Sequence, residues 1–427
     1  MLSDEVIEKV IERVVNRIEQ GNTYVLEQIG KSIKKIGTLS PSKAQQLVQI
    51  LRYGGDYDKI VKKLAEITEL NTKDIYKIFE EVAKNDYMFA KQFYDYRNIK
   101  FIPWEENELL QRQVNSLANI TVKKYINLTN TSALGFSIKQ LDKRGKLKTT
   151  FKDLSQTYID TLDTAIFNLA QGKTTFDQEM KKIIEQLGGS GLKTIDYASG
   201  RSVRMDSAVR TCLKDALRTL HNEEQQLFGE EFDADGVEIS VHEYPAPDHE
   251  LLQGRQFSVN KYDKDGNLIQ EGEFEKLQND KSCRSYDGTY FPAIADETGR
   301  DRRSIGQYNC YHYVFSIVLG VSEPAYTNQQ LRAIIERNRT GFEFDGKEYT
   351  MYEGTQLQRK LETEIRNQKD IQIMARASDN EGALIKSQTK INQLTQKYKE
   401  LNEISGLSSK LDRLKVSGYH PVKIKNK

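Results

Sequence analysis

The chain has 427 residues, 37% hydrophobic and 29% charged, with a formal net charge of +1 at pH 7. This length is enough for roughly two or three domains. The near-zero charge excludes a protein that binds polyanions over its whole surface, so any nucleic-acid contact needs a local basic patch. No apolar run reaches about 18 residues, so no membrane span is predicted.

The first 15 residues are acidic and amphipathic, and they lack the basic start and apolar core of a signal peptide. Three cysteines are too few for a disulfide framework and indicate synthesis in a reducing cytoplasm. Seven prolines in the whole chain favour long helices, because proline interrupts helices.

Residues 1 to about 130 are predicted to form a succession of amphipathic helices. Apolar residues recur every three or four positions between residues 6 and 18, which places them on one helix face. Gly21 is expected to end this helix. Asn71 or Thr72 is expected to cap a later one.

An aromatic-rich stretch follows at residues 87–104, with Pro103 marking a break before a helix over 105–121. Aromatic side chains at this density can form a stacking platform for nucleic-acid bases. The same pattern is more commonly a surface on which helices pack, and we expect packing here.

The middle of the chain begins with a predicted turn or short hairpin at residues 135–150. Helices are predicted at 155–170, 175–187 and 202–229. Residues 188–191 read Gly-Gly-Ser-Gly. Because no strand precedes them and no Gly-Lys-Ser/Thr follows, we expect a flexible turn and not a phosphate-binding loop.

Strand patterns begin after residue 236. Residues 237–241 alternate apolar and polar side chains, 257–259 form a second candidate strand, and 313–319 are the most apolar run in the chain. Hairpin turns are expected at 263–267 and 345–347.

From Thr355 onward, apolar stripes predict an antiparallel helical hairpin with its linker at residues 377–382. The end of the chain from Lys410 is predicted to be short and flexible, with nothing to fold against. Its basic side chains are candidates for nonspecific contact with DNA phosphates: Lys410, Arg413, Lys415, Lys423, Lys425 and Lys427.

The predicted fold is mainly α with a small α+β module. We expect a multi-helix N-terminal region at residues 1–150, a mixed central domain at 151–345, and a C-terminal helical hairpin with a basic tail at 346–427.

Histidine and cysteine gather between residues 242 and 312. Cys283, Cys310, His312 and either His242 or His249 would supply a zinc-type ligand set. Alternate residues of a strand share a face, so Cys310 and His312 can approach one point. The familiar Cys-x-x-Cys pair is missing, so the expectation is no bound metal or cofactor, with these residues as weak candidates.

Catalytic alternatives use the same residues. His249 could act as a base oriented by Asp248 and Glu243, and Cys310 with His312 could form a nucleophile pair. Asp296 and Asp301 could join His249 in a metal-dependent hydrolase. Because no spacing imposes such a geometry, we expect no enzyme and assign no catalytic residue.

Several segments, in this order, resemble the phage minor capsid protein 2 family and its relatives, the Mu F-like head morphogenesis proteins. They are Asn127–Thr131, Ile195–Arg201 with Asp206 and Arg210, Asp248-His249, Gln253–Phe257, Asn309–His312, Gly320–Tyr326 and Tyr349–Glu353. The resemblance covers residues 120–418, with Tyr311 at a position where the family usually has arginine.

The resemblance implies a structural head protein of a tailed phage. Such a protein would lie on the capsid interior at the portal vertex, contact the portal and other capsid proteins, and support head assembly and DNA packaging or ejection. Packaged double-stranded DNA would be a nonspecific partner. The alternatives left open are a nonspecific DNA-binding protein and a metal-dependent hydrolase centred on His249.

Overall fold

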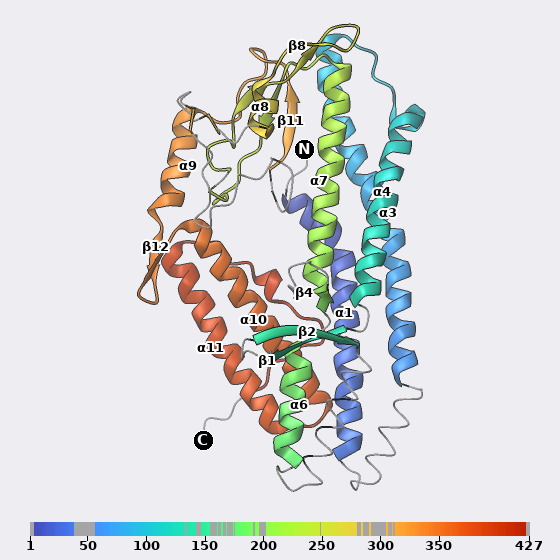
Figure 1. Ribbon diagram of the computed structural model, residues 1–427, viewed down its shortest axis with the longest axis vertical. Helices are drawn as coiled ribbons and strands as arrows, with labels where there is room; N and C mark the ends of the chain where they lie inside the picture. The colour runs from blue at the N-terminus through green and yellow to red at the C-terminus, as the bar shows by residue number, and fades with distance from the viewer. Residues whose placement is uncertain are drawn as a thin grey trace.

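A computed structural model describes residues 4–37, 56–132, 135–141, 147–153, 160, 164, 168, 174, 176–190, 193–195, 202–247, 249–279, 283–284, 290–291, 305, 310 and 312–423. Helices dominate these residues, and the strands form small antiparallel sheets (Figure 1). The predicted fold class, mainly α with a small α+β module, is therefore confirmed. Among the helices described, none combines the length and apolar character needed to cross a membrane.

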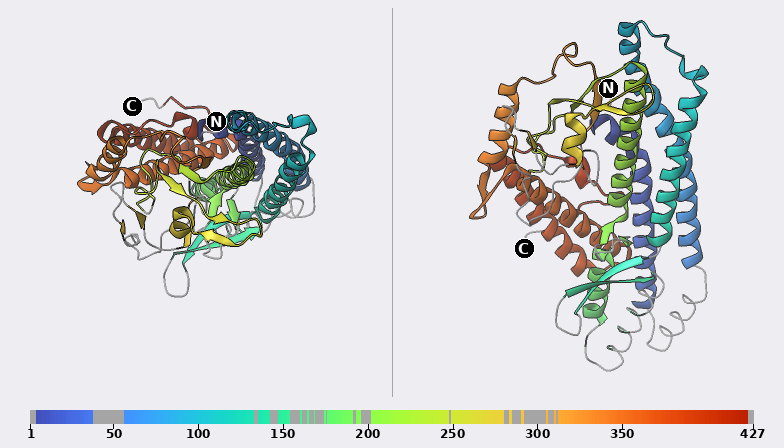
Figure 2. Two further views of the ribbon diagram at one scale, coloured as in Figure 1. Left: turned by 90° about the horizontal axis from the view of Figure 1, so that it is seen from above. Right: turned by 45° about the horizontal axis from the view of Figure 1, so that its top comes forward.

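Long helices form the tallest part of the molecule, and they run side by side in both Figure 1 and Figure 2. They are α1 (Asp4–Gly37), α3 (Asp56–Arg97), α4 (Glu108–Ser132) and α7 (Met205–Glu231). Each turns an apolar face inward, which gives a large core cluster that also includes residues of α6 and α10. The predicted boundaries 1–150, 151–345 and 346–427 stay a prediction, although this cluster draws residues from all three segments.

Two predicted helix ends are wrong. Gly21 lies inside α1, where a Cβ atom would be 3.1 Å from Ile67 Cδ1 of α3, so the glycine allows the helices to approach closely. Asn71 lies inside α3 and caps nothing. Its buried amide donates to the Tyr125 hydroxyl oxygen at 3.0 Å and accepts from Arg17 at 3.1 Å. Tertiary partners thus satisfy a side chain that otherwise favours helix ends.

Most of the aromatic stretch packs between helices, as predicted, and Tyr96 is exposed. Tyr87 is buried, its ring centre lying 4.6 Å from that of Phe101 and 5.3 Å from that of Phe228 in α7. Trp104 is also buried, in the short 3-10 helix η1 (Trp104–Glu106) that precedes α4. These contacts occupy the ring faces that a base-stacking platform would need.

The predicted hairpin near residue 140 is confirmed as β1 (Gly135–Leu141) paired with β2 (Leu147–Asp153). A second pair, β3 (Lys193–Ile195) with β4 (Ser202–Arg204), leads directly into α7. The helix predicted at 155–170 falls almost wholly outside the described residues.

Gly188 and Gly189 do not form a turn, which corrects the prediction for these two residues. They belong to α6 (Phe176–Ser190), the helix predicted at 175–187. A Cβ at Gly188 would lie 2.8 Å from the Cα atom of Ile371 in α10. The absent side chain therefore lets two helices pack at close range.

The expected strands after residue 236 are confirmed in one sheet with the order β11-β5-β6. Its strands are β5 (Gly236–Ile239), β6 (Gln256–Ser258) and β11 (Val314–Ile317), all antiparallel. Two expected turns are also present, between β7 (Lys261–Tyr262) and β8 (Leu268–Gln270) and between β12 (Phe342–Phe344) and β13 (Lys347–Tyr349). The remaining elements here are α8 (Glu273–Asn279), β9 (Cys283–Arg284), β10 (Tyr290–Phe291) and α9 (Asn328–Thr340).

The C-terminal helical hairpin is confirmed as α10 (Met351–Ala377) and α11 (Glu381–Ser405). Thr350 and Glu353 form a capping box that starts α10, and the Asn380 side chain caps α11. In Figure 1 the hairpin crosses the lower part of the long helices obliquely, and α10 packs against α1 and α6.

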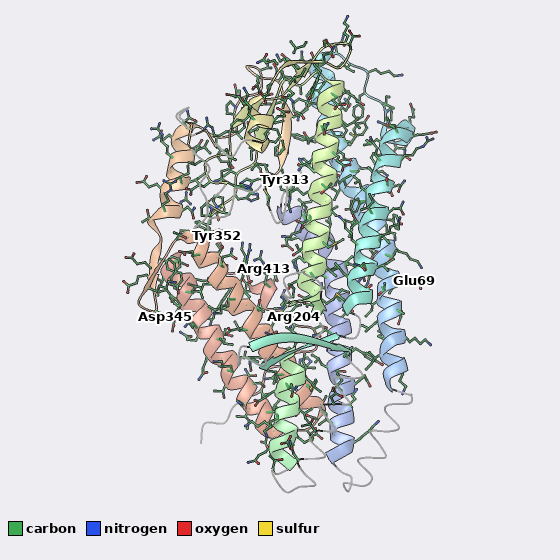
Figure 3. All side chains as sticks on the ribbon, in the orientation of Figure 1. Glu69, Arg204, Tyr313, Asp345, Tyr352 and Arg413 are labelled. Atoms are coloured by element: carbon green, nitrogen blue, oxygen red, sulfur yellow. The ribbon has the colours of Figure 1, made fainter. Side chains whose placement is uncertain are left out.

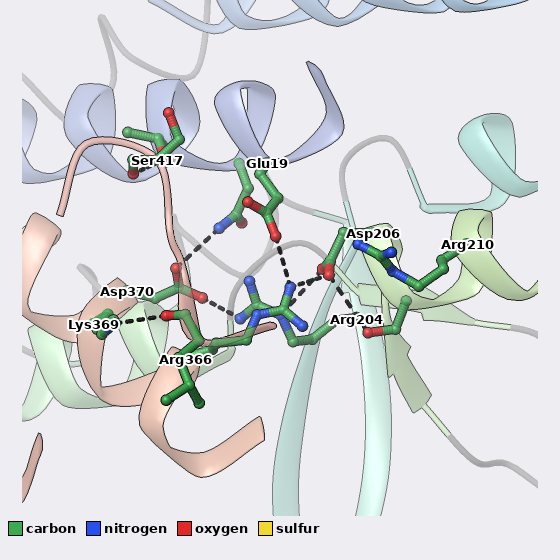
Figure 4. A network of polar contacts seen from close by, with 12 residues as sticks. Glu19, Arg204, Asp206, Arg210, Arg366, Lys369, Asp370 and Ser417 are labelled. Carbon is green, nitrogen blue, oxygen red and sulfur yellow. Dashed lines mark hydrogen bonds and ion pairs between the residues drawn. The ribbon is translucent and has the colours of Figure 1, made fainter. Parts of the chain in front are cut away.

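A buried ionic network joins α1, α7 and α10 (Figure 4). Arg204 donates to Asp206 at 3.1 Å and also pairs with Asp370. Arg366 pairs with Asp206 and lies 3.0 Å from Glu19. Two guanidinium groups therefore face three carboxylates in a region shielded from water.

The network has one carboxylate more than it has guanidinium groups, and Glu19 is the least well neutralised of the three. Burial alone would raise the pKa of Asp206, but Arg366 and Arg204 outweigh burial and hold it low. Burial raises the pKa of Asp370 in spite of Arg204. Burial, followed by repulsion from Asp206, raises the pKa of Glu19 to about 7 against the attraction of Arg366.

We expect Arg204→Met to lower the free energy of unfolding by about 3–5 kcal/mol, because it leaves Asp370 buried without its guanidinium partner. Urea denaturation followed by circular dichroism measures the loss. The control is Arg112→Met, which removes an exposed pair with Glu108. Equal effects of the two substitutions would contradict the role given to the network.

Glu19 should make stability depend on pH. Its folded pKa exceeds the ordinary value of 4.5, so its favourable contribution is complete below about pH 4.5 and is lost as pH rises through about 7. Glu19→Gln cannot ionise. Between about pH 5 and pH 8 the free energy of unfolding of the wild type should fall by about 2 kcal/mol relative to that of Glu19→Gln. The exposed Glu12→Gln substitution is the control, and it should give a curve parallel to that of the wild type.

Candidate functional site

The candidate site is a buried cluster of one cysteine and two histidines beside the three-stranded sheet. His249 lies in a helical turn between β5 and β6, and Cys310 and His312 lie just before β11. All three side chains are at most 3% exposed. Their potential ligand atoms lie within 4.8 Å of one another.

The sulfur atom of Cys310 is central to the cluster. It lies 3.5 Å from Nδ1 of His249 and 3.4 Å from Nδ1 of His312. The expectation that Cys310 and His312 share a side of the chain is consistent with this geometry. The ring of His242 lies next to them, with its centre 4.7 Å from that of His312.

Gln253 determines which nitrogen of His312 carries hydrogen. Its side-chain oxygen accepts from the backbone N–H of His242 at 2.9 Å, and a backbone N–H can only donate. Nε2 of His312 lies 3.2 Å from the same oxygen and must therefore donate to it. In the neutral ring this leaves Nδ1 with a lone pair directed at Cys310.

Neighbouring contacts hold this turn in place. Glu250, buried beside His249, accepts from Asn338 at 3.0 Å and pairs with Arg339, both on α9. Gly254 has a φ of +69°, and a Cβ there would lie 2.5 Å from Leu331 Cδ2. The turn at residues 253–255 thus requires glycine.

On the other side, the segment before β11 is attached to the sheet and to α7. Tyr313 donates its backbone N–H to the Ser240 hydroxyl oxygen at 2.8 Å. The Tyr313 ring, labelled in Figure 3, packs edge-on against His221 of α7, with ring centres 5.3 Å apart. The segment that carries His312 is therefore held both to the sheet and to α7.

The other sequence candidates are placed as follows. Cys283 begins β9, but its side chain, like Asp248, Asp296 and Asp301, lies outside what the structure describes. Glu243 is exposed, whereas His249 is 1% exposed. A substrate in solution does not reach the His249 ring in this conformation, which weighs against a hydrolase centred there.

The role of Gln253 was not predicted, and neither was the pairing of Glu250 with α9. One signal was present in the sequence: Gln253 follows His249 by four residues, a spacing that puts both on the same side of a helical turn. The contact with His312 depends on the fold and could not be found this way.

The basic tail is folded over its described residues, 410–423, which corrects the prediction of a flexible end. Leu414 and Val416 are buried, and Leu414 belongs to the 3-10 helix η2 (Leu411–Leu414). Lys369 donates to the Leu414 carbonyl at 2.6 Å, and Arg376 to that of His420 at 2.6 Å. The prediction counted charges and gave no weight to the apolar residues between them.

The candidate DNA-contacting residues differ in their surroundings. Arg413 lies 3.9 Å from Glu362 and 4.0 Å from Glu8, and Lys415 pairs with Asp412. Lys410 and Lys423 are exposed. Lys425 and Lys427 lie beyond the described part of the chain.

Comparison with known proteins identifies one family. The family model described as phage minor capsid protein 2 matches residues 2–402. No curated protein and no solved structure gives a significant match to the chain.

Proposed function

We propose that this chain, which belongs to the phage minor capsid protein 2 family, is a minor head protein associated with the portal vertex of a tailed phage. Family membership makes it a phage capsid protein and a component of the virion. The proposal adds its position on the capsid interior, its contact with the portal, and a role in head assembly and in DNA packaging or ejection.

Family membership across nearly the whole chain carries this proposal. The fold is compatible with it, since the long helices form a scaffold whose interior is packed with apolar and aromatic side chains. Membership in a capsid family also favours a structural protein over an enzyme.

The surface proposed to contact the portal is the end of the helical bundle where α3 connects to α4. Tyr96 is 61% exposed and Leu109 is 62% exposed, and Ile99 and Ile102 between them are also exposed. This connection lies at the upper end of the molecule in Figure 1, where the β7–β8 hairpin also presents apolar side chains. Apolar side chains gathered at one end are typical of a protein contact surface.

We expect Leu109→Asp to weaken association with the portal roughly tenfold, or about 1.4 kcal/mol, because the substitution places an unpaired charge in an apolar contact. Co-purification of the two proteins, followed by titration, measures the change. Ile404→Asp on α11 is the matched control, since Ile404 is 56% exposed but lies on a different element. Unchanged binding by Leu109→Asp would place the portal contact elsewhere.

Nonspecific contact with packaged DNA is proposed for the exposed basic residues near the end of the chain. Since Arg413 and Lys415 have acidic neighbours, Lys410 and Lys423 are the described candidates. The folded tail would present them from a fixed surface, and a fixed position lowers the conformational entropy lost on binding.

The double substitution Lys410→Gln/Lys423→Gln should make the log–log salt dependence of DNA binding shallower by about 2, since each neutralised phosphate contributes about 0.9. Fluorescence anisotropy over a salt series measures the slope. Lys73→Gln/Lys77→Gln on α3 is the control with the same charge change. Equal slopes for both double variants would rule out a specific contribution from the tail.

A further inference from the structure

We propose that His249, Cys310 and His312 bind a zinc-type transition-metal ion through the cysteine sulfur and the Nδ1 atoms of both histidines. The inference does not depend on the portal or on DNA. It rests on the geometry, burial and hydrogen bonding of these three side chains and of Gln253.

The two sulfur–nitrogen distances match a tetrahedral ion. Zinc lies about 2.3 Å from cysteine sulfur and about 2.0–2.1 Å from histidine nitrogen, so a tetrahedral angle places the sulfur and nitrogen about 3.5–3.6 Å apart. The observed separations are 3.5 Å to His249 and 3.4 Å to His312. Two of the three donor–donor distances therefore already fit a coordination shell, and the two nitrogens lie within 4.8 Å of each other.

The hydrogen bond from His312 to Gln253 is the kind that supports a metal ligand. Histidines that bind metal through one nitrogen usually donate the other N–H to an oxygen, which orients the ring. Here Nε2 donates to Gln253, so Nδ1 presents its lone pair to the cluster. Gln253 is a positioning residue and not a ligand.

A hydrogen-bonded cluster without metal is the competing explanation. A cysteine thiol has one hydrogen and can donate it to one of the two Nδ1 atoms at a time. A metal ion is coordinated by all three donors together. When it binds, Cys310 loses its proton to solvent, and a thiolate with two neutral imidazoles selects zinc-like ions over magnesium or calcium.

The fourth coordination position is open to His242 or to water. His242 is the described candidate because its ring is adjacent to that of His312. Four protein ligands are typical of a structural zinc site, and three with water are typical of a catalytic one. His242→Ala distinguishes the two arrangements. The substitution weakens metal binding if His242 is the fourth ligand, and it leaves binding unchanged if water is.

The first test is metal analysis of the full-length protein, purified without added metal and without chelators. We expect about one zinc ion per chain, lost in Cys310→Ser and in His312→Ala. Cys212→Ser is the matched control. Cys212 is a free cysteine on α7 whose thiol pKa burial raises to about 11, and replacing it should leave the zinc content unchanged.

The second test uses cobalt(II), which reports on its ligands by absorption. Titration of the apo protein should give the charge-transfer band of a thiolate ligand, and Cys310→Ser should lose this band. Gln253→Ala should weaken metal affinity about 10–100-fold while the band remains. Gln253→Glu should restore affinity, because a carboxylate also accepts from His312.

The wild-type protein decides the outcome even where a variant fails to fold. Wild-type protein that holds no zinc, and that shows no thiolate band with cobalt, would overturn the proposal and leave a hydrogen-bonded cluster. Zinc retained at the wild-type level by folded Cys310→Ser would also overturn it, by placing the metal at another site.

Discussion

The buried ionic network is the constraint on which the helix packing depends. Arg204 and Arg366 hold Asp206 and Asp370 where water is excluded, so either guanidinium without its carboxylates would be strongly unfavourable. Because the partners come from α10 and from the start of α7, with Glu19 of α1 alongside, only one relative placement of these helices satisfies them (Figure 4). Apolar packing alone tolerates sliding of one helix along another, and paired buried charges do not.

Periodicity in the sequence was enough to predict most helices and strands, because one buried face repeats at a fixed spacing. Periodicity failed at residues whose type is required by a contact between two helices. Gly21, Asn71 and Gly188 are residue types that favour helix ends or turns, and each lies within a helix. Close approach of Ile67 and Ile371 explains the two glycines, and polar partners on neighbouring helices explain the asparagine. Such contacts join residues distant in the chain, so no local pattern reveals them.

At the candidate site, too, the sequence identified the residues but not the contacts between them. Sequence composition singled out His249, Cys310 and His312, because cysteine and histidine are scarce in this chain. It could not show that they meet, nor that Gln253 fixes the tautomer of His312, since both depend on how the turn before β6 faces β11. The tail was mispredicted for a related reason. Its charges are evident in the sequence, whereas the burial of Leu414 and Val416 depends on a surface formed by other elements.

The small sheet has little apolar core of its own, so a metal ion at the proposed site would stabilise it. Its described cluster is limited to residues such as Val237, Leu252 and Phe257, far fewer than the helical core holds. One edge is anchored on α7, where the Ser316 hydroxyl donates to the Gln225 carbonyl at 2.6 Å. The turn that carries His249 is anchored on α9 through Glu250. A metal ion shared by His249 and Cys310 would join these two anchored parts, and small domains commonly gain stability from such a cross-link.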